Sequence, residues 1–478
     1  MQLGRIARIL GWALLALAAA QTLPLVAALS SSPALISGLL AATMFTGALG
    51  GLLLFAFEGI EDSRSRRTAL ATPVIAFSLL PVAAALPMVM TATAGPGAAL
   101  FMAVSAFTTT AAALHAPEEL SQPILLWRAE IAWIGGYATL LSVGAILSVL
   151  NIGGMRLSQT AIIKGESGRL TSTLRNVAAP TAWVYGLLTG AVFIIAWWAG
   201  NDPFLALLCA LQSVSTAGYA LPDMPPALGP VRVLAAIVAA SNLTLLWRVF
   251  DEPGRRRWAR DPELRGYILL LVSGALVFAL VLDQPMTGWA GLPDALWQGL
   301  RHAAGSITTT GLDQISPERL GPGAALLAAA LALAGGCTGS TAGGLRVMRA
   351  MILFQQANAE LQRLAHPKRV FRLRYAGAVL DRDRDLGGVW QALLAVLVAF
   401  GAGSLILSFT GLSYRETVAV SIAALSTAGP VAFAIDPAWD GYAALTNLQR
   451  ATVMILMIGG RVEPALFAAF FVRRYWKA

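Results

Sequence analysis

Residues 305–314, GSITTTGLDQ, place three threonines and a glycine between two long apolar stretches of the chain. A short apolar segment, 294–307, leads into them. At 1.5 Å of rise per residue, segments of ~10–14 residues reach about 15–21 Å, which is half the thickness of a bilayer. We therefore expect this segment to be a half-helix that enters a membrane and returns at the polar residues.

The same arrangement occurs four times. The short segments lie near 97–108, 203–215, 294–307 and 415–426, and they end in FTTTAAAL (107–114), VSTAGYAL (214–221), ITTTGLDQ (307–314) and LSTAGPVA (425–432). Aligned on the glycine position, which holds Ala111, Gly218, Gly311 and Gly429, they are 107, 93 and 118 residues apart (218−111, 311−218, 429−311). Because internal repeats are stronger evidence of fold than local motifs, we expect four units of span, half-helix, polar loop and span.

The composition indicates an integral membrane protein. Of the 478 residues, 57% are hydrophobic and 12% are charged, whereas soluble domains carry about 25% charge. Long continuous apolar runs favour helices over a barrel, whose strands alternate. Spans of about 20 residues or more lie near 8–29, 34–57, 69–92, 124–150, 178–199, 229–249, 266–283, 322–345, 387–410 and 445–470. We interpret the first as a retained helix rather than a cleaved signal peptide.

Helix-start signals support the half-helices. Asn201-Asp202-Pro203 offers a cap followed by proline, Pro293-Asp294 resembles it, and Ser413 with Glu416 matches a capping box.

The distribution of basic residues predicts the orientation in the membrane. The basic clusters fall on one expected side, which we take as cytoplasmic together with both termini: Arg64, Arg66, Arg67, Arg156, Lys164, Arg169, Arg175, Arg255, Arg256, Arg257, Arg260, Lys368, Arg369, Arg372, Arg374, Arg473 and Arg474. The other side holds the half-helices and the carboxylates Glu118, Glu119, Asp202, Asp223, Asp294, Asp313, Asp436 and Asp440. Carboxylates there either concentrate cations or are ordinary solvated loop residues. The net charge of +9 fits membrane orientation rather than binding of nucleic acid.

The polar loops have the chemistry of a cation filter. Irregular backbone persists at membrane depth only where it is buried in protein or lines a water-filled cavity. Rings of backbone carbonyls can replace the hydration shell of a cation. Glycine would let the backbone turn those carbonyls inward, and half-helices would aim their negative C-terminal ends at the ion. The alternative is that these are Ser/Thr/Gly packing sites between helices.

The segment GGCTGSTAGGLR (335–346) lies in the middle of the span that follows the third loop. Its glycines each cost about 1 kcal/mol relative to alanine in a helix, so we expect a broken helix with an intramembrane loop below the filter. A phosphate-binding loop would need a lysine that is absent here. The other alternative is close helix packing through small residues.

Several charged residues stand apart from the loops. Arg461, in GGRVEP, lies inside an apolar span, where a charge normally faces a partner or a cavity. The alternative to a role near the gate is a structural ion pair with Glu463 or another carboxylate. We expect Arg128 to be structural or interfacial and Arg346 to be either part of the gate or a snorkelling anchor. We assign no metal site to His115, His302 or His366. The charged stretch 356–385 is either a solvated loop or a docking face.

These motifs together resemble the Trk/Ktr/HKT superfamily of potassium transporters, most closely the bacterial Trk-type translocating subunit. The resemblance rests on SAFTTTAAAL, LLWRAEIAWIGGYATLLSVGAIL, QSVSTAGYALPD, GSITTTGLDQISP, GGCTGSTAGGLRVMR, AHPKRVFRLR, ALSTAGP and MIGGRVEP, which run from about residue 60 to the C-terminus. Each motif alone is weak, and their combination is specific.

The resemblance implies an all-α membrane protein with four membrane–pore-helix–membrane repeats in pseudo-fourfold arrangement around one pore, plus two extra N-terminal helices. It places the units at 1–60 (helix pair), 61–175, 176–262, 263–385 (with the gate and a cytoplasmic segment) and 386–478. It also implies a homodimer in the bacterial cytoplasmic membrane and a cytoplasmic nucleotide-binding ring as regulatory partner. No organic cofactor and no nucleic acid are expected.

The family's filter maps onto four triplets whose carbonyls would coordinate the ion: Thr109, Thr110, Ala111; Thr216, Ala217, Gly218; Thr309, Thr310, Gly311; Thr427, Ala428, Gly429. The gate maps onto Gly335, Gly336, Gly339, Ser340, Thr341, Gly343, Gly344 and Arg461. Ala111 departs from the family's first filter glycine, and the superfamily includes members with a non-glycine residue there that favour sodium. A left-handed φ costs alanine about 1 kcal/mol, so strict potassium selectivity is in question.

The expected function is therefore channel-like uptake of potassium, which is the substrate. A sodium-permeable or weakly selective relative of the same fold is the first alternative. A second is an ion-coupled secondary transporter for a small solute, although such folds use inverted repeats and two broken helices, and we expect one broken span. A membrane enzyme would need clusters of His, Asp or Cys within the spans, which the sequence lacks.

Overall fold

The computed structural model describes residues 3–59, 66–143, 170–200, 202–222, 224–246, 260–281, 291–311, 322–366, 373–376, 378–380, 385–463, 466–467 and 470. The α-helices are α1 (Leu3–Ala20), α2 (Thr22–Ser31), α3 (Ile36–Ala56), α4 (Arg66–Met90), α5 (Pro96–Phe107), α6 (Gln122–Ser142), α8 (Leu170–Trp198), α9 (Pro203–Val214), α10 (Leu228–Ala239), α11 (Leu243–Leu246), α13 (Pro262–Val281), α14 (Leu292–Ile307), α15 (Pro322–Ala334), α16 (Val347–Ala365), α17 (Gly387–Phe409), α18 (Tyr414–Leu425), α19 (Val431–Ile435) and α20 (Asn447–Val462). Short 3-10 turns occur at Pro33–Leu35, Pro117–Glu119 and Tyr442–Ala444.

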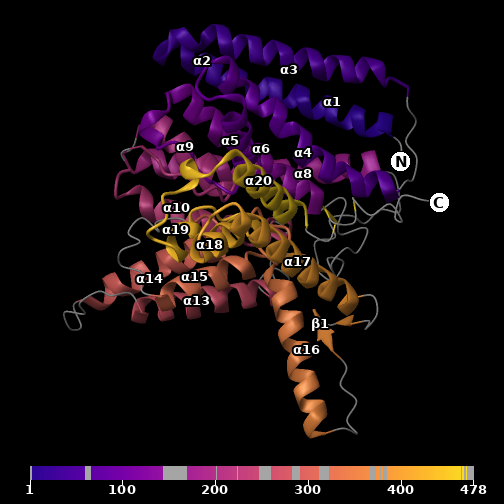
Figure 1. Ribbon diagram of the computed structural model, residues 1–478, viewed down its shortest axis with the longest axis vertical. Helices are drawn as coiled ribbons and strands as arrows, with labels where there is room; N and C mark the ends of the chain where they lie inside the picture. Colours follow the sequence, from indigo (N-terminus) through magenta and orange to yellow (C-terminus); the bar gives the residue numbers. More distant parts are fainter. Residues whose placement is uncertain are drawn as a thin grey trace.

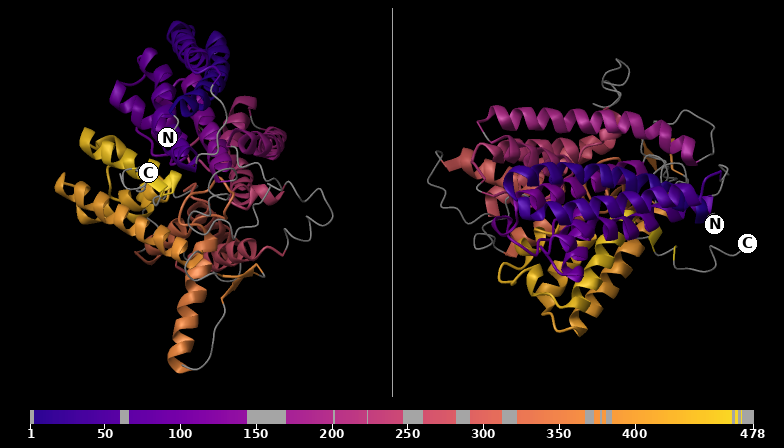
Figure 2. Two further views of the ribbon diagram at one scale, coloured as in Figure 1. Left: turned by 90° about the vertical axis from the view of Figure 1, so that its right-hand side faces the viewer. Right: turned by 90° about the horizontal axis from the view of Figure 1, so that it is seen from above.

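The helices form a bundle in which neighbours in sequence are mostly neighbours in space (Figure 1). Helices α1 and α3 pack against each other along one side, and α4 joins them to α5 and α6. Helices α13, α14 and α15 form a second packed group, and α17, α18 and α20 a third. Seen from above, the helices of these groups lie side by side and run in roughly the same direction (Figure 2).

Six segments among the described residues are long and apolar enough to cross a membrane. They are Leu3–Ser31, Pro33–Ala56, Leu70–Met90, Val177–Trp198, Pro262–Val281 and Gly387–Phe409. The expected span at 124–150 begins as α6, and its last part lies outside the described residues. The protein is thus a multi-pass helical membrane protein, as the composition predicted.

Three expected spans are interrupted. The span at 229–249 is divided into α10 and α11 by Ala240–Asn242, and the span at 322–345 ends as a helix at Ala334. The span at 445–470 ends at Val462, because Glu463 adopts a left-handed φ of 84°. The expectation of one broken span was therefore wrong: the break in the gate segment is confirmed, and two others accompany it.

All four half-helices form where the sequence predicted them, as α5, α9, α14 and α18. The Asp202 carboxylate caps α9 by accepting from the amides of Phe204 (3.0 Å) and Leu205 (3.3 Å). Ser413 and Glu416 form the predicted capping box on α18. The expected cap at Asp294 was wrong, since α14 begins after Gly291 without a side-chain cap and Asp294 lies in its first turn.

Helix α16 leaves the bundle as a single arm (Figure 1, Figure 2). Beside it lies a small antiparallel hairpin, β1 (Arg374–Tyr375) and β2 (Ala378–Val379). These two-residue strands are the one described departure from an all-α chain. The arm begins directly at the end of the gate segment, so the two are mechanically linked.

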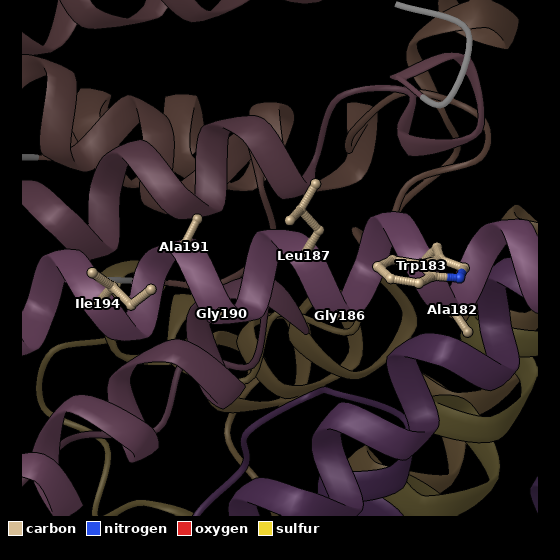
Figure 3. A pocket seen from close by; sticks show the side chains of 7 residues that line it. All are labelled: Ala182, Trp183, Gly186, Leu187, Gly190, Ala191 and Ile194. Carbon is tan, nitrogen blue, oxygen red and sulfur yellow. The ribbon is translucent and has the colours of Figure 1, made fainter. Parts of the chain in front are cut away.

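Helix α8 carries an open groove of about 590 Å³ on its surface, shown in Figure 3. The groove is lined by apolar and small residues: Ala182, Trp183, Gly186, Leu187, Gly190, Ala191 and Ile194. A Cβ added to either glycine would meet no atom within 4 Å. Such a surface suits lipid or helix packing, and it offers no oxygen ligands for an ion.

The cap of α9 yields a stability prediction. Asp202→Ala removes the side-chain acceptor of two first-turn amides and should lower stability by about 1 kcal/mol. The matched control is Asp294→Ala, which removes an exposed first-turn carboxylate that caps nothing. Thermal unfolding of both variants in detergent should show a lower Tm for Asp202→Ala alone. Equal losses in the two variants would contradict the cap assignment.

Candidate functional site

Each half-helix ends in the same left-handed turn, centred on a threonine. The φ angles of Thr109, Thr216, Thr309 and Thr427 are 56°, 57°, 58° and 52°. In three loops the next amide then bonds five residues back, as in a Schellman cap: Thr110 to Ser105 O (2.9 Å), Ala217 to Gln212 O (2.9 Å) and Ala428 to Ala423 O (2.8 Å). The sequence pattern predicted the left-handed residue at the glycine position, and for this turn that prediction was wrong.

The glycine position divides the loops into two pairs. Ala111 and Gly311 are left-handed, with φ of 60° and 61°, whereas Gly218 and Gly429 are not. Those two glycines are required for space instead: an added Cβ would lie 1.4 Å from Thr310 O at Gly218, and 2.6 Å from Thr110 O at Gly429. The four loops therefore have twofold rather than fourfold geometry, and alanine at 111 reaches the same backbone as glycine at 311.

The four loops converge. The Gly429 amide donates to the carbonyl of Thr110 at 2.6 Å, which joins the fourth loop to the first. Gly218 lies against Thr310 O, which joins the second loop to the third, and a Cβ on Gly311 would lie 2.6 Å from Cβ of Pro430, next to the fourth loop. Of the twelve residues predicted for the filter, all but Gly218 are buried, and Gly218 is half-buried. The structure thus brings together segments whose glycine positions are 93 to 318 residues apart in sequence (311−218, 429−111).

The hydroxyls of the loops differ between the two pairs. In the first and third loops, Thr108 bonds Thr110 (2.8 Å) and Thr308 bonds Thr310 (2.9 Å) through their Oγ1 atoms. In the second and fourth loops, the positions that correspond to Thr110 and Thr310 hold alanine, Ala217 and Ala428. The Oγ1 atoms of Thr109 and Thr427 are buried with no hydrogen-bond partner in the described part of the chain. Buried unpaired hydroxyls are costly.

Two buried tyrosines brace the loops, and the sequence analysis missed both. The Tyr442 hydroxyl donates to the carbonyl of Gly429 at 2.9 Å. The Tyr219 hydroxyl pairs with Ser105 Oγ (3.1 Å), which donates to the carbonyl of Ala112 (2.9 Å), and so links the second loop to the first. Tyr219 directly follows Gly218, and that adjacency was the available signal.

Arg128 is part of this brace. Its guanidinium lies 4.2 Å from the centre of the Tyr219 ring, and its side chain is 2% exposed. It also lines a cavity of about 270 Å³ with Tyr219, Tyr442, His115 and Asp440. The expected structural role of Arg128 is thus a cation–π contact that packs on the second loop.

The gate segment lies directly against the loops. The Gly343 amide donates to Thr309 Oγ1 at 2.8 Å, and Thr341 Oγ1 donates to the carbonyl of Val214 at 3.0 Å, where α9 ends. A Cβ on Gly343 would lie 2.2 Å from Ser426 O. The segment therefore touches the second, third and fourth loops at once, as predicted for a loop below them.

The glycines of the gate segment serve two purposes. Gly335, Gly339 and Gly344 have left-handed φ angles of 70°, 81° and 77°. Gly336 and Gly343 instead have no room for a side chain: a Cβ on Gly336 would lie 2.6 Å from that of Ala342. Within the segment, the Ser340 hydroxyl donates to Cys337 O at 2.6 Å. A continuous helix is excluded at these positions.

The arginines around the gate segment are buried. Arg461 donates through Nε to Thr139 Oγ1 (2.7 Å), while Nη1 and Nη2 have no partner among the described residues. Glu463 pairs with Arg349 at 2.7 Å, so the alternative of an Arg461–Glu463 pair was wrong. Arg346 is 3% exposed and donates to Ala342 O at 2.6 Å. It binds the gate segment and is not a snorkelling anchor.

The predicted outer carboxylates have varied surroundings. Those at the surface are Glu118, Glu119, Asp202, Asp294 and Asp440, while Asp436 is buried. Glu119 pairs with His115 at 3.1 Å. Asp223 and Asp313 lie outside the described residues, as do most of the basic residues used for orientation. Within the described chain, no cluster of three or more His, Cys, Asp or Glu residues could hold a metal ion.

Comparison with known proteins agrees with this geometry. Residues 254–476 match the family model described as TrkH, cation transport protein. The Trk system potassium uptake protein TrkH of Halomonas elongata is 26% identical over all of both chains, and that of Salmonella typhimurium is 27% identical over 79% of each. The crystal structure of the potassium transporter TrkH from Vibrio parahaemolyticus superposes with a TM-score of 0.87, covering all of both chains at 24% identity. This likeness confirms the expected fold with its four pore repeats.

The strained backbone of Ala111 gives a prediction with two readouts. Ala111→Gly should stabilise the protein by about 1 kcal/mol, because glycine adopts a left-handed φ without the steric cost of a Cβ. It should also raise the preference for potassium over sodium, since the first loop would hold its backbone with less strain. The measurements are thermal unfolding and alkali-ion flux in liposomes.

The matched control is Ala92→Gly, because Ala92 has a similar φ of 54° at the end of α4, outside the loops. It should stabilise the protein without altering ion preference. An unchanged potassium-to-sodium ratio in Ala111→Gly would count against a role of this residue in selectivity.

Proposed function

The chain belongs to the TrkH cation transport family, and on that premise we propose that it carries potassium ions into the cell through a channel-like pore. Membership makes it a transport protein rather than an enzyme. The ion moves down its electrochemical gradient, to which the membrane potential contributes about 2.3 kcal/mol per charge per 100 mV. The potassium ion is the substrate, and the pore requires no organic cofactor.

The observation that carries this proposal is the convergence of four capped half-helices on one cluster of irregular backbone. A dehydrated cation needs several oxygens at once, and peptide carbonyls of the twelve loop residues would supply them. The C-terminal ends of α5, α9, α14 and α18 add their negative dipole ends. The hydroxyls of Thr109 and Thr427, which have no hydrogen-bond partner in the part of the chain that the structure describes, fit the same need for oxygen ligands.

A sodium-permeable or weakly selective pore is the second candidate, and Ala111 favours it. Its φ of 60° matches that of Gly311, so the loop has the same backbone at a higher energy. If the strained backbone of the first loop relaxes when an ion binds, the loop can adjust to ions of different size. It then discriminates less sharply between potassium and sodium. An ion-coupled transporter for a small organic solute gains no support from the four loops.

The gate in this proposal is the segment from Gly335 to Gly344 together with Arg461. Within it, Thr341 bonds the end of α9, and Ser340 bonds the carbonyl of Cys337 in the same segment. Because it packs against three loops, an ion leaving them inward would have to displace it. Among the described residues, the two terminal nitrogens of Arg461 have no hydrogen-bond partner. The positive charge of this guanidinium would raise the barrier for a cation until the segment moves.

The assembly proposed here follows the family. The chain forms a homodimer in the bacterial cytoplasmic membrane with both termini in the cytoplasm. A nucleotide-binding ring docks on 356–385, and the exposed Phe354, Leu361 and Leu364 of α16 offer apolar contacts for it. The functional units are 1–60, 61–175, 176–262, 263–385 and 386–478.

The test is ion flux with a variant that blocks the loops. In liposomes, the protein should pass potassium and rubidium, and it should restore growth of a potassium-uptake-deficient bacterium at low potassium. Gly218→Ala should reduce flux about tenfold or more, because its Cβ would overlap Thr310 O and a barrier change of ~1.4 kcal/mol alters a rate tenfold.

The control is Gly229→Ala, where an added Cβ meets no atom within 4 Å. It should keep the parent flux. Transport of an organic solute without any flux of alkali ions would overturn the proposal. Equal flux in both glycine variants would show that the ions do not pass through the four loops.

A further inference from the structure

Glu263 is a buried carboxylate that belongs neither to the four loops nor to the predicted gate residues. It lies in the first turn of α13 and is 1% exposed. Its Oε1 accepts three hydrogen bonds: from the amide of Thr338 (2.6 Å), the hydroxyl of Thr338 (2.9 Å) and the amide of Met348 (3.3 Å). These bonds satisfy a buried polar group that would be costly to leave without a partner.

The three donors belong to two different elements. Thr338 lies in the middle of the gate segment, between Gly335 and Gly344. Met348 is in the first turn of α16, where amides have no partner within the helix. Arg346, the residue before α16, supplies no side-chain cap. Glu263 therefore caps α16 from another helix and holds the gate segment with the same oxygen atom.

The first turn of α16 is held a second time. Arg349 pairs with Glu463 at 2.7 Å, and both side chains are buried. Glu463 stands where α20 ends, two residues after Arg461. The arm of α16 (Figure 1) is thus fixed at its base to α13 and to the end of α20, and it emerges from the bundle beyond these two contacts.

We propose that Glu263 is the positioning residue that holds the gate segment against the loops and couples its movement to that of α16. This rests on the proposed gate. A buried carboxylate that loses its donors is left unsatisfied at high cost. The hydrogen bonds that Glu263 accepts from Thr338 and from Met348, at the base of α16, therefore break together. A force applied to the exposed arm would reach the gate through this shared acceptor.

The test uses Cys337, which is fully buried and adjacent to Thr338. The chain has two cysteines, Cys209 and Cys337, so Cys209→Ser leaves one native reporter in the gate segment. Labelling of Cys337 by a small methanethiosulfonate reagent and basal rubidium flux are measured on the same full-length protein in liposomes.

The variants in this background are Glu263→Gln, which removes the charge at constant size, and Thr338→Val, which removes the hydroxyl donor only. The control is Glu58→Gln, which alters an exposed carboxylate just after α3, a helix that packs on α1 and α4. We expect labelling about tenfold faster for Glu263→Gln, a smaller increase for Thr338→Val, and no change for the control. Basal flux should rise in the same order, and Glu263→Asp should restore part of the protection.

Parent-like labelling in both Glu263→Gln and Thr338→Val would overturn the proposal. If Glu263→Gln does not give a monodisperse protein, Thr338→Val decides, since it keeps the carboxylate and the side-chain volume. Faster labelling in a protein that passes no alkali ion would sustain the role of Glu263 and instead refute the proposed function, so the two failures are distinguishable.

Discussion

The structure depends on one constraint: peptide groups at membrane depth must find partners without water. The half-helices satisfy their last carbonyls with a left-handed threonine cap, repeated in each loop at φ of 52° to 58°. The irregular backbone beyond the caps packs against the other loops, the two bracing tyrosines and the gate segment. Contacts such as that of Tyr442 with the carbonyl of Gly429 give these few peptides a partner.

Much of this could be predicted from sequence. Four polar tetrads, each after a segment too short to cross a bilayer, gave both the half-helices and their convergence. The glycines from Gly335 to Gly344 gave the broken helix, because so many are incompatible with a continuous one. Asp202 and Ser413 gave two helix starts, since their capping chemistry is local.

The remainder required three-dimensional information. A threonine in a left-handed conformation has no sequence signal, since propensity assigns that role to glycine, and the twofold pairing of the loops arises from contacts between Gly218 and Thr310. Pro293-Asp294 failed as a cap because proline and aspartate there follow the helix start. Glu263 bonds Thr338, 75 residues away in sequence, and Tyr442 bonds Gly429, 13 residues away. A single sequence does not reveal such partners.

The central claim is that the four loops together bind a dehydrated alkali ion, and diffraction tests it most directly. Crystals of the detergent-solubilised protein grown in potassium and soaked in thallium would carry a strong anomalous scatterer chemically similar to potassium. The account predicts anomalous peaks enclosed by carbonyl oxygens of residues 109–111, 216–218, 309–311 and 427–429. Peaks confined to the surface carboxylates, with none among the loops, would contradict it.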